Sequence, residues 1–402
     1  MVRTPSIYGQ LLRFFPRNEF DRLVAAHAAE KHAKGFSCWT QFVAMLFCQL
    51  SQADSLREIC TGLACTLGKL RHLGVSAAPK KSTLAYANAH RPPALYEAVF
   101  WDALARFRDA GSLGPRSCKF TFKNKLLSLD STTVSLCLSL FPWASYRHDK
   151  GGVKAHVLLD HDDYLPSWVL LTEANVADIR AARLLPLNPG SIVAMDRGYN
   201  DYSLFGDWTA RGVFFVTRLK DDTRYDVVES RAVPAGTNVR ADQVIRLASE
   251  AGTRACPYLL RRVVVWDEEN GREIALLTNL LDFDAAVVGA IYKERWQIEL
   301  FFKALKQNLK VKSFVGTTEN ALRTQIWTAL IALLLVRWLK HLSRAGWSLS
   351  LTASMLRMNL FVYRDLREWL DDPLVWDDEP TPIDQLELAI PGLGQARIGG
   401  RG

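Results

Sequence analysis

The pattern of hydrophobic and polar residues changes near residue 120 of this 402-residue chain. Before that point, apolar residues recur every three or four positions, as Phe42, Met45, Leu46 and Leu50 do, and this spacing predicts helices. After it, short apolar runs predict buried strands. The expected strands lie near 125–134, 153–160, 166–172, 191–195 and 213–219, and the expected helices near 178–185 and 200–211.

The most informative helical pattern covers residues 285–310, which we expect to form one long helix. With about 100° per residue, one side carries an aromatic hydroxyl, three cations and a carboxylate. These polar residues are Tyr292, Arg295, Glu299, Lys303 and Lys306. The opposite side is a predicted core-facing stripe of Ile291, Ile298, Phe301, Leu305 and Leu309. A carboxylate among cations is ordinarily a weak surface ion pair, so the polar stripe indicates a site only if other carboxylates meet it.

Two aspartates are candidates for carboxylates that lie close to this polar stripe. Asp130 comes at the end of an apolar run, and Asp196 directly follows Ser191–Met195, with Arg197 and Gly198 permitting a sharp turn. Acids at the ends of buried strands lie at the rim of a sheet, where α/β folds build their sites. Either Asp alone could merely cap a strand end or a following helix. Two of them together with Glu299 favour a catalytic cluster.

The chemistry of that cluster follows from its residue types. Three carboxylates without a suitable His or Cys cluster suit hard cations, so we expect Asp130, Asp196 and Glu299 to bind Mg²⁺, for which Mn²⁺ can substitute. Two such ions can hold the attacking and leaving oxygens of an in-line phosphoryl displacement. The neighbouring cations would bind adjacent phosphates. The cluster thus predicts metal-assisted phosphodiester chemistry on a nucleic acid.

These motifs resemble those of bacterial insertion-sequence transposases with a DDE triad. Asp130, Asp196 and Glu299 are similar to the triad itself. Tyr292, Arg295, Glu299 and Lys306 match the Y-x2-R-x3-E-x6-K signature of one cut-and-paste subgroup. Three further segments are similar to the first-aspartate motif, the strand after it and the second-aspartate motif: Leu129–Thr132, Gly151–Asp160 and Asp196–Tyr199. The resemblance covers about 125–310, and more weakly a helical N-terminal domain over 1–110.

The resemblance implies an α/β fold with a ribonuclease-H-like catalytic core and a DNA transposase activity. It implies that a homodimer pairs the terminal inverted repeats of the element, that hydrolysis frees a 3′-OH, and that this 3′-OH attacks target DNA. Tyr292, Arg295, Lys303 and Lys306 would hold backbone phosphates. Two other functions stay open: a catalytically silent DNA-binding regulator, disfavoured by the intact triad, and a structure-selective nuclease, disfavoured by the Y-R-E-K signature.

A β unit inserted at about 222–280 is also expected, because 258–266 and 272–278 flank an Asn270-Gly271 turn. The resembled subgroup stacks an aromatic from this unit on a flipped base, and Trp266 is the candidate here. Two alternatives remain. Trp266 could instead pack inward with Val264, and Trp296, which borders the catalytic stripe, could take its place.

Composition places the expected DNA contact in the N-terminal part. The net charge of +8 favours a polyanionic partner, and residues 1–125 hold 18 Lys and Arg against 8 Asp and Glu. We predict a helical DNA-binding domain over 1–120, a catalytic domain over 121–345 and a helical C-terminal region over 346–402. The last contains an acidic stretch, 365–387, whose default interpretation is a solvated tail, with a dimer contact or a cover over the basic domain as alternatives.

A helix-turn-helix-like DNA reader is predicted within the N-terminal domain. Ser55–Glu58 has the pattern of a capping box that opens one helix, and 82–91, ended by Pro92-Pro93, would lie in the major groove. The candidate contacts with bases or phosphates are Lys80, Lys81, Tyr86, Asn88 and Arg91. The alternative is that these side chains form an ordinary surface.

The remaining features indicate a cytoplasmic protein with no membrane partner, and the resemblance implies a bacterial protein that is associated with the nucleoid when it binds DNA. Seven cysteines without a C-x-x-C pair are typical of reduced, buried thiols. The apolar run 326–339 is too short and interrupted for a membrane span, and we expect a buried helix there. Asp160–Asp163 is predicted to be a solvated hairpin tip rather than a metal cluster.

Overall fold

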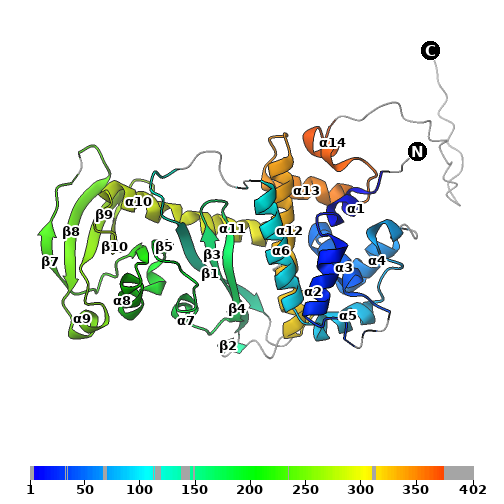
Figure 1. Ribbon diagram of the computed structural model, residues 1–402, viewed down its shortest axis with the longest axis horizontal. Helices are drawn as coiled ribbons and strands as arrows, with labels where there is room; N and C mark the ends of the chain where they lie inside the picture. Colours follow the sequence, from blue (N-terminus) through cyan, green and yellow to red (C-terminus); the bar gives the residue numbers. More distant parts are fainter. Residues whose placement is uncertain are drawn as a thin grey trace, which may run out of the picture.

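The computed structural model describes residues 4–31, 33, 35–66, 70–111, 113, 119–136, 145–147, 150–233, 235–309 and 314–374. The molecule is elongated, with a sheet-rich half and a helical half side by side (Figure 1). One pair of consecutive helices, α10 (Ala285–Glu294) and α11 (Trp296–Asn308), runs along the sheet toward the helical half. The fold is therefore mixed α/β, as the sequence predicts.

The strands of the described residues form one sheet. They are β1 (Leu126–Leu136), β2 (Ser145–Arg147), β3 (Lys150–Asp160), β4 (Leu165–Glu173), β5 (Ile192–Met195), β6 (Phe214–Arg218), β7 (Tyr225–Ser230), β8 (Val239–Leu247), β9 (Leu260–Asp267) and β10 (Arg272–Thr278). Their order is β2-β3-β1-β5-β6-β10-β9-β8-β7, with β4 beside β3. The ladders β1–β5 and β5–β6 are parallel and the others are antiparallel. All five strands expected between 125 and 219 are present, as β1, β3, β4, β5 and β6.

The two short helices expected beside these strands are also present, as α7 (Asp178–Ala182) and α8 (Tyr202–Ala210). The expected hairpin at Asn270-Gly271 joins β9 to β10, with Asp267 paired to Arg272 and Gly271 at φ 60°. Strands β7–β10, together with α9 (Glu250–Ala255), continue the same sheet because β10 pairs with β6.

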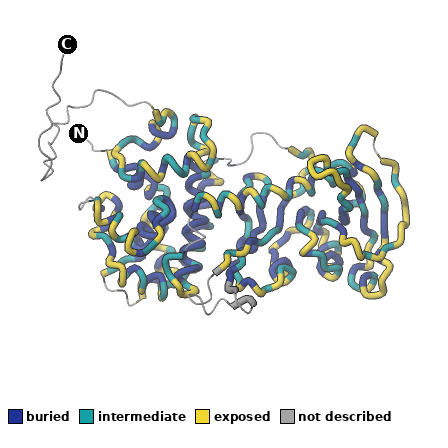
Figure 2. The backbone as a smooth tube through the Cα atoms, turned by 180° about the vertical axis from the view of Figure 1, so that it is seen from behind, coloured by how far each residue is buried: buried dark blue, intermediate teal, exposed yellow. Residues whose placement is uncertain are grey.

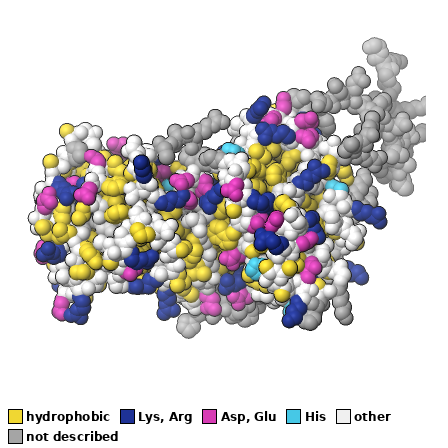
Figure 3. Space-filling model, viewed as in Figure 1, with side chains coloured by type: hydrophobic (Ala, Val, Ile, Leu, Met, Phe, Trp, Pro, Cys, Tyr) yellow, Lys and Arg dark blue, Asp and Glu magenta, His cyan; other side chains and the backbone are white. Residues whose placement is uncertain are grey.

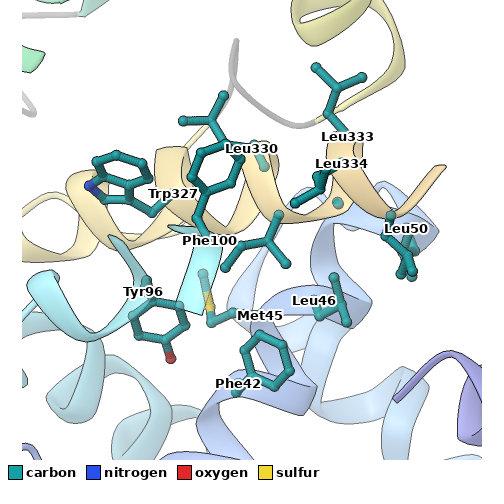
Figure 4. Packing of buried hydrophobic residues seen from close by; sticks show 14 of the residues in the cluster. Phe42, Met45, Leu46, Leu50, Tyr96, Phe100, Trp327, Leu330, Leu333 and Leu334 are labelled. Atoms are coloured by element: carbon teal, nitrogen blue, oxygen red, sulfur yellow. The ribbon is translucent and has the colours of Figure 1, made fainter. Parts of the chain in front are cut away.

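The helical half combines segments from both ends of the chain. Its elements are α1 (Ile7–Leu12), α2 (Arg17–Ala26), α3 (Cys38–Ser51), α4 (Leu56–Ala64), η1 (Arg71–Leu73), α5 (Lys81–His90), α6 (Ala94–Ala110), α12 (Glu319–Leu342), α13 (Leu349–Asn359) and α14 (Leu366–Asp371). Helix α12 packs against α3, α5 and α6. Phe100 lies beside Trp327 and Leu330, and Met45 and Phe42 of α3 extend the same core away from α12 (Figure 4). The predicted boundaries at 120 and 345 therefore do not separate two cores, because α12 completes that of the N-terminal helices.

Helix α12 corresponds to the apolar run 326–339, which was considered as a membrane span. It is the one described helix long and apolar enough to cross a membrane by composition, but 89% of its apolar window is buried inside the protein. Figure 2 shows the buried backbone concentrated in the central helices and along the strands. Helix α12 is thus the buried core helix predicted from the run 326–339.

The expected single helix over 285–310 is interrupted at Arg295. The Arg295 amide donates to the Tyr292 carbonyl and the Ile298 amide to the Arg295 carbonyl, both at 3.1 Å, which makes a tighter turn than an α-helix. The core-facing stripe of Ile291, Ile298, Phe301, Leu305 and Leu309 is buried as predicted. Gly289 lies in α10, where an added Cβ would approach Val265 Cγ1 to 3.0 Å, so glycine permits close packing on β9.

Three predictions of exposure were wrong in part. Asp160 and Asp163 are 5% and 8% exposed, because cations from other elements pair with them, whereas the Asp162 side chain in the same turn is 72% exposed. Cys65 is exposed, whereas Cys38, Cys48 and Cys256 are buried. The acidic stretch is partly packed, since α14 buries Leu366, Trp369 and Leu370. Cys118, Cys137 and residues 375–402 lie outside the described residues.

A buried ion pair fastens the outer strands to the start of α10. Arg261 of β9 donates to both carboxylate oxygens of Asp242 of β8, at 2.8 and 2.7 Å. The same guanidinium donates to the carbonyls of Leu280 and Phe283, just before α10. Arg261 and Asp242 are both nearly inaccessible to solvent, so each charge depends on the other.

Arg261→Leu should reduce the free energy of unfolding by about 3–5 kcal/mol, because the Asp242 carboxylate is left buried without a counter-charge. The urea midpoint measures this loss. The matched control is Arg254→Leu, which breaks an exposed pair with Glu250 and should cost less than about 1 kcal/mol. Equal midpoints for the two variants would contradict a structural role of the buried pair.

Candidate active site

The sheet itself brings the two aspartates together. In the parallel ladder of β1 and β5 the last pair is Leu129 with Met195, so Asp130 and Asp196 follow it side by side. Leu129 and Met195 both pack in the core under α8. Because side chains alternate along a strand, Asp130 and Asp196 point to the other face, which α10 and α11 cover.

Helix α11 supplies the third carboxylate, and Arg295 lies between it and β1. Arg295 Nη2 donates to Glu299 Oε1 at 2.8 Å, and Arg295 Nη1 lies 3.6 Å from Asp130 Oδ2. The guanidinium carbon also lies 5.7 Å from the centre of the Tyr292 ring. Four of the residues predicted from the sequence, Asp130, Tyr292, Arg295 and Glu299, thus form one contact group.

The pKa of Asp130 reflects its burial and the charges around it. Burial raises the pKa of Asp130 to about 6, and the negative charges of Glu299 and Asp196 act in the same direction. The Ser131 amide, 2.8 Å from Oδ1, and the positive charge of Arg295 lower this pKa but do not restore it. Asp130 therefore lies where a further positive charge would be favourable.

The donor set fits a hard divalent cation, since it consists of carboxylate oxygens whose mutual repulsion a cation would relieve. Across the described ranges, no three His, Cys, Asp or Glu side chains are already close enough to share one ion. Between Asp130 and Glu299 the compensating charge is the Arg295 guanidinium. The arrangement can gather cations and phosphates on one face of β1.

The two lysines of the stripe lie farther along α11. Lys306 Nζ donates to the Thr133 carbonyl of β1 at 3.4 Å, so this side chain reaches across to the strand that carries Asp130. Lys303 is exposed one turn earlier. Both are on the same side of the helix as Glu299, as the periodicity predicts.

A polar cluster that the sequence did not reveal supports the site from the opposite face of β1. Ser131 Oγ donates to Asp178 Oδ1 at 2.8 Å, and Lys154 Nζ donates to the same oxygen at 3.2 Å. His156 Nδ1 lies 3.5 Å from it, and burial lowers the pKa of His156 to about 4, so the ring is neutral at pH 7. Lys154 and His156 both belong to the strand segment Gly151–Asp160, which was the available signal.

Trp266 lies on the opposite face of the sheet from Asp130, Arg295 and Glu299. Val263 and Val265 of β9 pack in the core with α10, so by alternation Trp266 points to the other face of the sheet. There its ring lies 5.8 Å from the Arg240 guanidinium carbon. Trp296, in contrast, follows Arg295 directly and is 56% exposed.

The N-terminal candidates divide into two groups. Lys80 and Lys81 are exposed, and Tyr86 is 67% exposed with its ring stacked on His90. Asn88 is 1% exposed and accepts from Gln41 Nε2 at 2.8 Å, so the prediction that it contacts DNA was wrong. Arg91 is held inside the helical half.

Arg91 Nη1 donates to Gln41 Oε1 at 3.0 Å, and its guanidinium covers the Phe36 ring and donates to the Phe36 carbonyl. The predicted helix-turn-helix was also wrong. Residues 65–80 separate α4 from α5, whereas a helix-turn-helix motif has a turn of three or four residues.

The capping box at the start of α4 is confirmed: the Glu58 amide donates to Ser55 Oγ and the Asp54 amide to Glu58 Oε2. On the face in Figure 3, positive and negative side chains are interspersed rather than gathered in one basic stripe.

Comparisons with known proteins identify the family of the chain. The family described as "Transposase DDE domain" matches residues 121–335, and a domain of unknown function, DUF4372, matches residues 3–76. A putative transposase of Sinorhizobium fredii, y4zB, is 36% identical over 76% of this chain and 82% of its own length. A probable transposase for insertion sequence element IS5377 of Geobacillus stearothermophilus is 33% identical over 58% of this chain and 61% of its own length.

A third relative, a putative transposase for insertion sequence element IS4SA of Synechocystis, is 30% identical over 55% of this chain and 62% of its own length. The transposase DDE domain match extends over more than half of the chain and includes the strands and helices that carry Asp130, Asp196 and Glu299. The chain therefore belongs to the DDE transposase family of bacterial insertion sequences.

Proposed function

We propose that this transposase moves its element by a cut-and-paste route, with Asp130, Asp196 and Glu299 as ligands of two Mg²⁺ ions. The observation that supports the proposal is the position of Asp130, buried beside Arg295 and Glu299 and within the electrostatic influence of Asp196. Bound ions would activate the attacking oxygen and stabilise the leaving one. A DDE transposase cleaves and joins DNA strands with divalent metal ions, and this site is the candidate for both reactions.

The side chains around the triad take up the DNA strand. Arg295, Lys303 and Lys306 present cations along one side of α11, where they would bind phosphates next to the scissile one. Tyr292 is half-buried beside Arg295 and would orient a phosphate or sugar through its hydroxyl. Holding a DNA end in place after the first cut is what separates a transposase from a nuclease that releases its product.

The same proposal assigns a role to each of the other parts of the chain. Strands β1 and β3–β6 form the ribonuclease-H-like core, β7–β10 are the inserted β unit, and the helical half binds DNA. Lys80, Lys81 and Tyr86, exposed near the start and middle of α5, are its candidate contacts with the terminal inverted repeat. Two copies would pair the two ends of the element before attack on target DNA in the nucleoid.

Asp130→Asn and Glu299→Gln should each slow cleavage of the element's own end DNA by at least about a thousandfold, since each removes a metal ligand. Binding of the same DNA, measured by mobility shift, should persist. The matched control is Glu319→Gln, whose carboxylate pairs with Arg323 on the surface and which should cleave normally. Cleavage at the wild-type rate by either triad variant would remove that residue from the active site.

The pKa of Asp130 predicts a pH dependence for metal binding. Its value of about 6 in the folded chain is above the ordinary 3.8, so protonation stabilises the metal-free fold at low pH and this stabilisation is lost as pH rises through 6. Asp130→Asn should therefore stabilise the metal-free protein at pH 8 by about 1–3 kcal/mol, and much less at pH 4.

Mg²⁺ binds the ionised carboxylate, so thermal stabilisation of the wild type by Mg²⁺ should be larger at pH 8 than at pH 5. Glu319→Gln should follow the wild type in both measurements. If Mg²⁺ stabilised Asp130→Asn and the wild type equally at pH 8, Asp130 would not be a ligand.

We propose Trp296, rather than Trp266, as the aromatic that stacks on an unpaired base at the element end. Stacking contributes about 1–3 kcal/mol per base, so Trp296→Ala should slow release of the second strand from pre-nicked end DNA by about tenfold to a hundredfold. Trp266→Ala serves as the comparison and should leave this step unchanged. If Trp266→Ala slowed second-strand release more than Trp296→Ala does, Trp266 would be the stacking aromatic.

A further inference from the structure

A second carboxylate, Glu294, lies next to Arg295 and is 3% exposed. It is the last residue of α10, directly before the tight turn that joins α10 to α11. Its two oxygens have different partners: Lys119 Nζ donates to Oε1, and the Tyr164 hydroxyl donates to Oε2 at 3.3 Å. A buried carboxylate with partners from two other segments fixes the position of the helix end that carries it.

Glu294 is also linked to β1, the strand of Asp130. His161 Nδ1 lies 3.9 Å from Glu294 Oε2, and its Nε2 is 2.7 Å from Ser128 Oγ. Ser128 precedes Asp130 by two residues and therefore lies on the same face of the strand. Glu294 therefore lies beside the His161 ring that Ser128 of β1 contacts, and the chain itself joins Glu294 to Arg295, which lies next to Asp130.

The partners of Glu294 on the β3–β4 turn are themselves held by the helical half. Arg108 of α6 donates to Asp163 Oδ2 at 2.6 Å, and Arg337 of α12 donates to the Tyr164 carbonyl at 2.6 Å. Lys125 Nζ lies 2.6 Å from Asp160 Oδ2. The β3–β4 turn therefore has ion-pair and hydrogen-bond partners both in the helical half and at the start of β1.

We propose that Glu294 is a positioning residue for the transposase reaction: it anchors the α10–α11 junction to the β3–β4 turn and thereby holds the Arg295 guanidinium between Asp130 and Glu299. The inference rests on the proposed function of that site. Glu294 itself touches neither substrate nor metal ligand, and it acts through Arg295, its neighbour in the chain.

The negative charge of Glu294 is what this position needs. Glutamine has the same shape, and its oxygen can accept from Lys119 while its NH₂ group donates to the Tyr164 hydroxyl, but it is neutral. Glu294→Gln therefore removes the ion pair with Lys119 and loosens the junction while it preserves the volume of the side chain. Because a displacement of about 1 Å can reduce a rate by about a hundredfold, the catalytic arginine is sensitive to that loosening.

The test compares Glu294→Gln, Arg295→Lys and the double variant in the full chain, with end DNA and Mg²⁺. Glu294→Gln should lower the maximal cleavage rate by about tenfold to a hundredfold, with the affinity for end DNA unchanged. In the Arg295→Lys background the same substitution should add little further loss, because both changes affect one group. Amide hydrogen exchange over 291–300 in the metal-free protein should become faster in Glu294→Gln.

Glu269→Gln is the matched control, because Glu269 pairs with Lys293, the neighbour of Glu294, but both side chains are 75% exposed. It should change neither cleavage nor exchange. Additive losses in the double variant, or unchanged exchange and cleavage in Glu294→Gln, would overturn the positioning role. A wild type that does not cleave end DNA would refute the proposed function instead, and the exchange measurement would still decide whether Glu294 anchors the junction.

Discussion

The active site depends on the burial of one hydrophobic stripe in two cores. Val288 and Ile291 of α10 pack with the sheet, whereas Ile298 and Phe301 of α11 pack in the core of the helical half. Each such side chain contributes about 1.5–3 kcal/mol when buried, so the rotation of the helix pair about its axis is strongly fixed. With that rotation set, the polar stripe can only face β1. Hydrophobic packing therefore determines where the Glu299 carboxylate lies.

Two buried arginine–carboxylate arrangements differ in a way that separates structure from function. Arg261 is matched to one carboxylate by two hydrogen bonds and finds further acceptors in backbone carbonyls, so its charge is fully compensated. Arg295 faces two carboxylates with a third nearby, and the pKa of Asp130 stays raised because the burial of this carboxyl, together with the charges of Glu299 and Asp196, outweighs the guanidinium. A buried carboxylate whose charge is incompletely compensated is a feature of candidate catalytic sites.

The sequence predicted the elements whose signal is periodic and local. The strands carrying Asp130 and Asp196 and the buried stripe of α11 could be identified because alternation and 100° spacing are set by the backbone alone. The wrong predictions concern side chains whose partners are distant in sequence. Asn88 is buried by Gln41, and Asp163 by Arg108, and nothing local in their segments signals these contacts. The interruption of the helix at Arg295 was not predicted. The neighbouring Glu294 has its partners, Lys119 and Tyr164, in two other segments, and nothing local signals these contacts.

The same distant contacts show that the helical half is not an independent module appended to the sheet. Helix α12 completes the core of the N-terminal helices, and its Arg337 also grips the β3–β4 turn beside the catalytic strand. Burial lowers the pKa of Arg337 to about 10, yet the group stays charged at neutral pH and is held by the Tyr164 carbonyl and the Phe301 ring. Phe301 lies on α11, two residues after Glu299. Packed side chains therefore connect the helical half directly to α11, the helix that carries Glu299.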